Sequence, residues 1–240
     1  MLQIKNSRNN PALVVSSFVK ALKLLTTPGI RQFLIIPILI NILLYGTAFS
    51  LSYFYMNELI EQFIPAWLHW LNWVLWPLFF ICFSIVVFFS FTVLANLLAA
   101  PFYGKLAAKT QWLITGQVGS EVIQPLRKVM LAEIKRANYL AVRFIPSLIL
   151  FIIPGVNIVA PFLWALLGAW GMALEYLAYP LENEGILFSE QKQLLKARRL
   201  SALSFGGITM FGLTVPVLNI VMAPLAVIAA TIYCQALKAE

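Results

Sequence analysis

The chain has 240 residues, of which 61% are hydrophobic and 11% charged, and its net charge at pH 7 is +8. Its mean hydropathy of +0.87 excludes an ordinary soluble domain, because such a domain needs far more polar surface. The composition predicts a polytopic integral membrane protein, with residues 1–240 as a single membrane domain.

The positive charges are distributed as in a membrane protein. Lys and Arg cluster before the first apolar segment, after the second and again at 192–199, whereas the connection between the first two segments carries Glu58 and Glu61 without a basic residue. Cytoplasmic loops hold the excess of Lys and Arg in such proteins. The pattern predicts cytoplasmic N- and C-termini, and because it accounts for the charge, we expect no nucleic-acid partner.

Residues 11–26 predict an amphipathic helix, with Leu13, Phe18 and other apolar side chains opposite Lys20 and Lys23. Two interpretations are open. The helix lies in the plane of the membrane interface, or it packs on another part of the protein.

The junction Thr27-Pro28-Gly29-Ile30-Arg31 precedes 23 uncharged residues, 33–55, which predict a first transmembrane helix. Thr27 suits a helix N-cap, Pro28 the first helical position, and Gly29 leaves the following amides uncovered by any side chain. Free amides, the positive end of the helix dipole and the Arg31 guanidinium favour an anion site, and hence anion transport. Arg31 also fits an ordinary cytoplasmic flank that is released to water.

A second full-length span is predicted within residues 62–104, which contain no Lys, Arg, Asp or Glu. It begins at a cluster of tryptophans three residues apart, which is typical of the non-cytoplasmic interface: Trp67, Trp70, Trp73 and Trp76. Residues 125–141 then predict another amphipathic helix, rich in Lys and Arg on its polar side.

Two apolar stretches, 144–174 and 200–237, contain related interruptions. Pro-Gly-Val-Asn-Ile-Val-Ala-Pro at 154–161 is echoed by Pro-Val-Leu-Asn-Ile-Val-Met-Ala-Pro at 216–224. Each stretch is either one kinked span or a helical hairpin that enters the membrane partway, with its tip at Pro-x-x-Asn. Paired interrupted segments indicate a transport site, and the basic flanks at 143 and 192–199 favour the hairpins.

The residues required for catalysis are scarce. The chain has one His, no Asp and two isolated cysteines, Cys82 and Cys234, without metal-ligand spacing or a Gly-rich phosphate loop. We therefore expect neither an enzyme, nor a metal site, nor a cofactor.

A few polar side chains inside apolar stretches are candidates for the transport path. Glu175 is a candidate proton-coupling group, or else it pairs with Arg143 or a neighbouring basic residue. Asn157 and Asn219 are candidate pore-lining groups, or else they cap broken helix ends. Asn41 and Asn96, in the two predicted spans, are further candidates of the same kind.

Several motifs along nearly the whole chain resemble the CysZ-type sulfate permeases of bacterial inner membranes. They keep their order and spacing: Thr27-Pro28-Gly29-Ile30-Arg31-Gln32-Phe33, Pro65-Ala66-Trp67-Leu68-His69-Trp70-Leu71, Trp76-Pro77-Leu78, Ala99-Ala100-Pro101-Phe102-Tyr103-Gly104, Ile153-Pro154-Gly155, Tyr176 with Tyr179-Pro180, and Pro216-Val217-Leu218-Asn219 with Ala223-Pro224.

This resemblance implies proton-dependent uptake of sulfate into the cytoplasm, for sulfur assimilation and cysteine biosynthesis. It implies an all-α membrane fold with two full-length transmembrane helices, two partly inserted helical hairpins and amphipathic interfacial helices, assembled as a homo-oligomer in the lipid bilayer.

The resemblance also implies a sulfate site at a Gly-x-Arg-Arg helix start, which falls on Gly29, Ile30 and Arg31. Gln32 replaces the second arginine, so one guanidinium is left for a dianion. The alternative function is a membrane scaffold or assembly protein that binds anionic lipid and partner proteins without transport.

Overall fold

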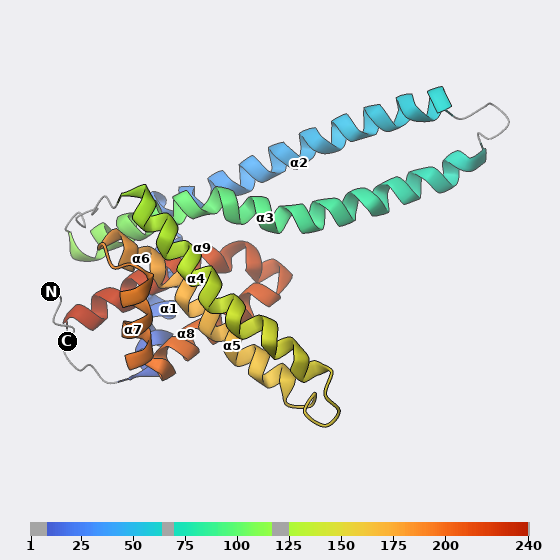
Figure 1. Ribbon diagram of the computed structural model, residues 1–240. Helices are drawn as coiled ribbons and strands as arrows, with labels where there is room; N and C mark the ends of the chain where they lie inside the picture. The colour runs from blue at the N-terminus through green and yellow to red at the C-terminus, as the bar shows by residue number, and fades with distance from the viewer. Residues whose placement is uncertain (1–8, 64–69, 117–124, 240) are drawn as a thin grey trace. The chain divides into compact units, whose positions relative to one another are not determined.

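The computed structural model describes residues 9–63, 70–116 and 125–239, and within these ranges every regular element is helical, as the sequence predicts (Figure 1). The chain divides into two compact units. One comprises Met1–Arg31 with Tyr103–Glu240, and the other comprises Gln32–Phe102. The single membrane domain expected from the sequence stays a prediction.

The helices follow one another in a simple order. They are α1 (Pro11–Leu25), α2 (Pro28–Phe63), α3 (Asn72–Thr115), α4 (Leu126–Ser147), the 3-10 helix η2 (Leu148–Phe151), α5 (Ala160–Tyr176), α6 (Ala178–Asn183), α7 (Phe188–Ala197), α8 (Arg199–Thr214) and α9 (Pro216–Ala239).

The unit Gln32–Phe102 is formed by α2 and α3 lying side by side, joined by aromatic contacts (Figure 1). The ring centroids of Phe49 and Phe80 are 5.8 Å apart, and those of Tyr53 and Trp76 are 4.9 Å apart. Trp70 and Trp73 are exposed, whereas Trp67 and His69 lie outside the described residues. With 36 and 44 residues, α2 and α3 are about 54 and 66 Å long, more than the ~30 Å hydrocarbon core requires.

The core of the other unit is built from α1, α5, α8 and α9. Phe18 of α1 packs against Phe205 of α8, with ring centroids 5.1 Å apart. Buried Thr110, Thr209 and Thr231 each donate their hydroxyl hydrogen to a carbonyl four residues earlier, so these polar groups cost little inside apolar helices. Buried Val14 and Ala21 show that α1 packs on the protein, one of its two predicted interpretations.

The contact between α5 and α8 brings their backbones together. Gly206 of α8 lies so close to α5 that a Cβ there would fall 1.7 Å from the carbonyl oxygen of Ala169. Gly168 provides similar room for the Met210 side chain. Small residues allow such close helix packing in membrane proteins.

Both interrupted apolar stretches change direction at the predicted motif. Between η2 and α5 the chain turns through residues 152–159, where Gly155 has a φ of +82°, so that α4 and α5 run back alongside each other (Figure 1). Between α8 and α9 the helix breaks at Val215, whose backbone is extended. The insertion of these hairpins partway into a membrane stays a prediction.

Within the described residues, two segments are long and apolar enough to cross a membrane. They are Ala160–Asn183, which runs through α5 and α6, and Val221–Ala239 of α9, while the shorter apolar helices Ile42–Met56 and Asn72–Val86 fall in α2 and α3. Among the described residues, these two segments lie in the interrupted stretches rather than in the two segments predicted as full-length spans.

Candidate functional site

The turn between α1 and α2 forms the predicted start of the first long helix. α2 begins at Pro28, and the Thr27 N–H donates to the Leu24 carbonyl at 2.9 Å. The Ile30 and Arg31 N–H groups both donate to the Thr27 carbonyl, at 2.9 and 3.1 Å. The prediction that the amides after Gly29 are uncovered is therefore wrong for these two, because the first helical turn closes on Thr27.

The side chains at this helix start point in different directions. Ile30 is buried in the core, with 1% of its surface exposed, whereas Arg31 is exposed and makes no ion pair with any described residue. Arg31 lies about 200° around the helix from Gly29, at 3.6 residues per turn. Gln32 follows with an exposed side chain. The structure thus leaves the Arg31 guanidinium available to an anion.

Lys109 of α3 lies beside Gly29, a neighbour that sequence reasoning missed. Its Cε would be 3.3 Å from a Cβ at Gly29, and its ammonium lies 3.9 Å from the centroid of the Trp112 ring. Lys109 comes 80 residues after Gly29, so only the fold brings them together. The positive end of α2 therefore has a second cation near it.

Glu175, the candidate coupling group, lies at the end of α5 among tyrosines. The rings of Tyr103, Tyr176 and Tyr179 pack on one another, with centroids 5.4 to 6.5 Å apart. The positive charge that acts on half-buried Glu175 comes from Arg136 of α4 rather than from Arg143. Glu175 is absent from the ion pairs among the described residues, so Arg136 is near it without a direct contact.

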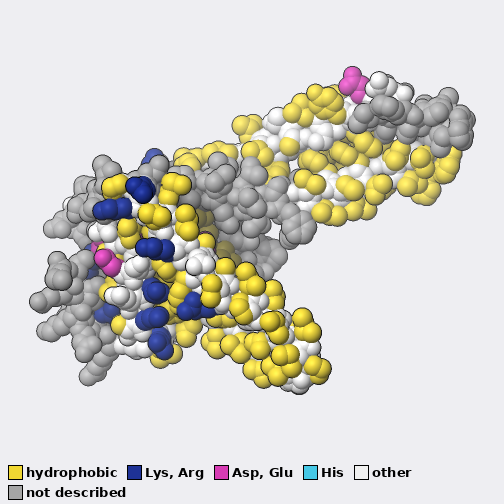
Figure 2. Space-filling model, viewed as in Figure 1, with side chains coloured by type: hydrophobic (Ala, Val, Ile, Leu, Met, Phe, Trp, Pro, Cys, Tyr) yellow, Lys and Arg dark blue, Asp and Glu magenta, His cyan; other side chains and the backbone are white. Residues whose placement is uncertain are grey.

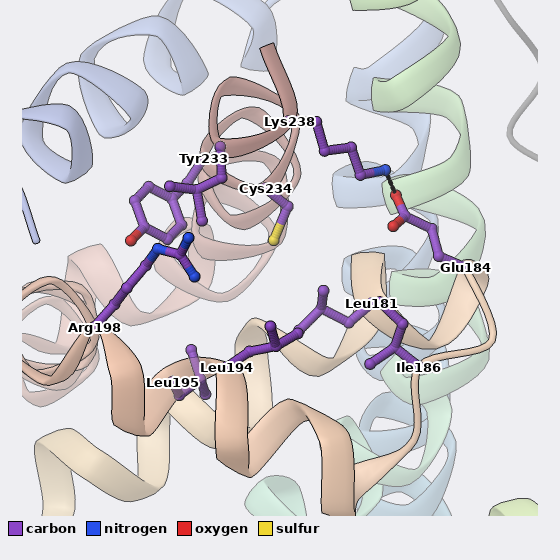
Figure 3. A pocket seen from close by; sticks show the side chains of 10 residues that line it. Leu181, Glu184, Ile186, Leu194, Leu195, Arg198, Tyr233, Cys234 and Lys238 are labelled. Atoms are coloured by element: carbon purple, nitrogen blue, oxygen red, sulfur yellow. Dashed lines mark hydrogen bonds and ion pairs between the residues drawn. The ribbon is translucent and has the colours of Figure 1, made fainter. Parts of the chain in front are cut away.

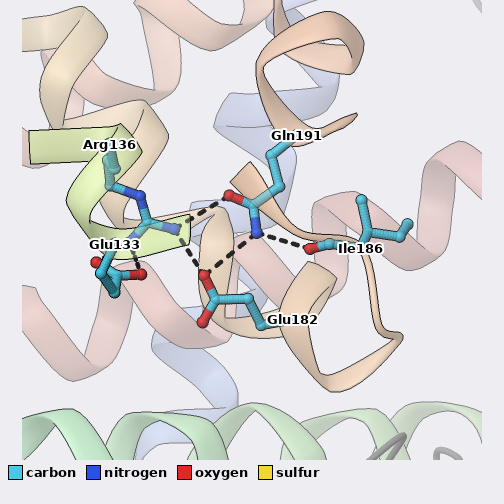
Figure 4. Close-up of polar contacts among 5 residues, drawn as sticks. All are labelled: Glu133, Arg136, Glu182, Ile186 and Gln191. Atoms are coloured by element: carbon cyan, nitrogen blue, oxygen red, sulfur yellow. Dashed lines mark hydrogen bonds and ion pairs between the residues drawn. The ribbon is translucent and has the colours of Figure 1, made fainter. Parts of the chain in front are cut away.

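Arg136 is the centre of a polar network that the sequence does not reveal (Figure 4). Its Nη2 donates to Glu182 Oε1 at 2.6 Å and to Gln191 Oε1 at 3.1 Å, and its Nη1 lies 2.9 Å from Glu133 Oε1. Gln191 in turn donates its amide N–H to the Ile186 carbonyl at 2.8 Å. The network joins α4, α6 and α7 where a buried guanidinium would otherwise lack partners.

Asn157 and Asn219 lie where the two apolar stretches are interrupted. Asn157 is in the turn before α5, and Asn219 is in the first turn of α9. Both side chains are exposed, and neither caps a backbone group of a described residue. Their amides are free to line a path, whereas the predicted capping role finds no hydrogen bond in this part of the chain. Asn41 and Asn96 have side chains outside those the structure describes.

A small cavity lies between α6, α7 and α9 (Figure 3). It has a volume of about 30 Å³ and an almost wholly apolar lining that includes Leu181, Leu195 and Cys234. At its edge Lys238 pairs with Glu184. The almost wholly apolar lining offers an oxyanion few hydrogen-bond donors, so this cavity is not a candidate anion site.

Comparison with known proteins assigns the family. The profile described as "Sulfate transporter CysZ/Etoposide-induced protein 2.4" matches residues 17–224. Among the relatives, the "Sulfate transporter CysZ" of Pseudomonas syringae pv. tomato is 37% identical, covering 93% of this chain and 92% of its own. The protein of the same description from Pectobacterium atrosepticum is 35% identical, covering 94% and 86%. The chain belongs to the sulfate transporter CysZ/etoposide-induced protein 2.4 family.

Proposed function

We propose that this protein transports sulfate across the bacterial inner membrane, supplying sulfur assimilation and cysteine biosynthesis. The observation that carries the proposal is the similarity to relatives described as sulfate transporters, which extends over nine-tenths of the chain. The apolar helices fit a multi-pass membrane protein, and the charge pattern supports cytoplasmic termini. We also propose that the protein forms a homo-oligomer and that its sulfate transport depends on protons.

Sulfate is proposed to bind at the start of α2, at Gly29, Ile30, Arg31 and Gln32. Because the Ile30 and Arg31 amides already donate to Thr27, charge is the main source of recognition. The exposed Arg31 guanidinium offers a fork of N–H donors that matches an oxyanion, and the positive helix end adds to its attraction. Lys109 is a second cation near this helix end, on the Gly29 side rather than the Arg31 side, and it adds to the positive potential that attracts the dianion.

The path beyond this site must be polar or hydrated, because sulfate keeps both charges near neutral pH. The exposed amides of Asn157 and Asn219, at the two chain reversals, are suitable donors for it. Glu175 beside Arg136 is the proposed coupling group, since a carboxylate with a nearby cation can exchange a proton as the local charge changes.

Partial insertion of the α4–α5 hairpin is part of the proposal. From residue 144 to the turn at 152–159 the chain spans about 10 residues, or roughly 15 Å, half the thickness of the hydrocarbon core. Side chains at its tip are strongly exposed and apolar, Ile152 and Ile158 among them. Such a surface is stable in lipid and costly in water.

Flux through purified protein tests the proposed function. Protein in liposomes should take up labelled sulfate faster than protein-free vesicles, and Arg31→Glu should reduce both binding and uptake about tenfold or more, because it replaces attraction by repulsion. Lys23→Glu is the matched control, since Lys23 is exposed on α1 and changes the charge equally. Uptake at the protein-free rate by the intact protein would favour the alternative function, a scaffold that binds anionic lipid and partner proteins.

A further inference from the structure

The outward side of α4 carries an apolar stripe that no other described helix covers. Its members are 48–64% exposed and fall within an arc of about 120° at 3.6 residues per turn: Met130, Leu131, Ile134, Val142 and Ile145. The same arc also holds two exposed polar side chains, Arg127 near the start of the helix and Asn138 near its middle. The opposite side of the helix is packed, with Ala132 and Ser147 buried. Apolar side chains as exposed as these five favour contact with another apolar phase.

Basic side chains flank this stripe on the side that faces α7. Lys128, Lys135 and Arg143 come from α4, and Lys192 comes from α7. In Figure 2, Lys and Arg side chains gather together with apolar ones over this part of the molecule. We call the stripe and its four cations the α4 basic face.

Two of these cations are held near one aromatic ring. The Arg143 guanidinium carbon lies 3.6 Å from the centroid of the Tyr139 ring, and the Lys192 ammonium lies 5.2 Å from it. Tyr139 is fixed by its hydroxyl oxygen, which accepts from Trp170 Nε1 at 3.2 Å, and by packing on Phe188. The cations are thus positioned by the fold rather than free in solvent.

Acidic residues do not neutralise this positive charge. Glu133, the only acid of α4, is engaged by Arg136. Among the described ion pairs, none includes Arg143 or Lys192. Glu190 of α7 is exposed to solvent and is absent from those pairs. The α4 basic face therefore carries a net positive charge beside an apolar stripe.

Arg143 is also the last charged residue before the apolar hairpin. Residues 144–174 contain no Lys, Arg, Asp or Glu, and the large side chains that the hairpin exposes are apolar, as at Ile152 and Phe162, although the Asn157 amide is also exposed. If the hairpin enters lipid, Arg143 and Lys192 lie at the level of the phosphate groups. We infer that the α4 basic face binds the headgroups of anionic phospholipids, with Arg143 and Lys192 as its central cations and acyl chains against the stripe.

A phospholipid is the occupant that satisfies both parts of this surface. A free phosphate or sulfate ion would meet the cations but leave the apolar stripe in water. An anionic lipid covers both with one molecule, because its phosphate and acyl chain are covalently joined. The inference is independent of sulfate transport, since none of these residues belongs to the proposed anion site.

The test uses the full-length protein in detergent and phosphatidylglycerol with a fluorescent acyl chain. Fluorescence polarisation should show at least about tenfold tighter binding of phosphatidylglycerol than of equally labelled phosphatidylcholine. Replacing both central cations, Arg143→Gln with Lys192→Gln, should weaken the binding of phosphatidylglycerol about 25-fold. This factor follows because each basic residue near a lipid surface contributes about 1 kcal/mol. The charge-preserving pair Arg143→Lys with Lys192→Arg should retain most of the binding.

The matched control is Lys20→Gln with Lys23→Gln, which removes two exposed charges from α1 and should leave binding within about twofold. An equal loss in this control would show general electrostatic attraction and overturn the inference. Displacement of the lipid by millimolar inorganic phosphate or sulfate would assign the cations to a free anion and also overturn it. Equal affinity of the intact protein for phosphatidylglycerol and phosphatidylcholine would also overturn the inference. Because this comparison needs no variant, it holds even if a variant fails to fold.

Discussion

The Lys109 side chain lies against Gly29, so that a Cβ at Gly29 would come 3.3 Å from Lys109 Cε. The contact places the end of α3 beside the start of α2. It puts an ammonium near the positive end of a helix, an arrangement that is unfavourable by itself and becomes favourable when an anion is bound. Lys109 is therefore proposed to help attract an anion to this helix end.

We expect Lys109→Gln to weaken sulfate binding about fivefold, which corresponds to about 1 kcal/mol for one partly exposed charge. Lys109→Arg should retain the affinity, because the charge and the reach are similar. Equilibrium binding of labelled sulfate to purified protein measures both. Lys105→Gln, on the exposed side of α3 one turn earlier, is the control. Unchanged affinity in Lys109→Gln would remove this residue from the site.

The close approach of α5 and α8 gives a sharp stability prediction. Gly206→Ala should destabilise the protein by about 3 kcal/mol or more, because the added methyl group would overlap the Ala169 carbonyl oxygen and force the helices apart. Gly207→Ala is the matched control, since nothing lies within 4 Å of a Cβ there and alanine favours a helix. Thermal unfolding in detergent compares them, and similar midpoints would contradict the described packing.

Replacing one partner of the Arg136–Glu182 ion pair should lower the stability of the protein. Only 11% and 26% of these side chains are exposed, so Glu182→Gln removes one of the two carboxylates that pair with a largely buried guanidinium and should cost about 2 kcal/mol. Glu190→Gln, on the exposed surface of α7, is the control. A thermal midpoint of Glu182→Gln at or above that of Glu190→Gln would argue against this network.

Glu133 should make the stability depend on pH. Burial raises the pKa of the Glu133 carboxyl and outweighs the opposite effect of Arg136, although the ion-pair distance is 2.9 Å, and the Glu182 charge raises the pKa further. The folded state therefore prefers the protonated form. The stability that Glu133 contributes is complete below the unfolded pKa of about 4.3 and is lost as the pH rises through the higher folded value.

Glu133→Gln should remove this dependence. Relative to wild type, the variant should gain stability as the pH rises above the unfolded pKa of about 4.3, whereas at lower pH the difference should be constant. Denaturation midpoints measured across this range report it, with Glu190→Gln as the control for loss of an acid. A wild-type protein that gains stability over the variant as the pH rises would mean that the ion pair with Arg136 dominates.

Local patterns in the sequence were enough to predict the helix start at Pro28, the interruptions of the two apolar stretches and the membrane class. Each follows from neighbours in the chain: proline favours the first helical position, the Pro-x-x-Asn motifs interrupt helices, and long uncharged stretches require lipid or burial. The amides after Gly29 were predicted wrongly because the same local rule did not count the Thr27 carbonyl, which the first turn brings beneath them.

The sequence by itself thus determined that this chain is helical, apolar and similar to a family of transporters, because composition, periodicity and motif order are properties of the chain alone. The tertiary structure decided which distant groups meet: Lys109 beside Gly29, Arg136 among Glu133, Glu182 and Gln191, and Asn9, whose Oδ1 accepts from the Ser201 N–H at 2.8 Å. Such pairings depend on how helices cross, and that is set by packing between surfaces rather than by any local run of residues.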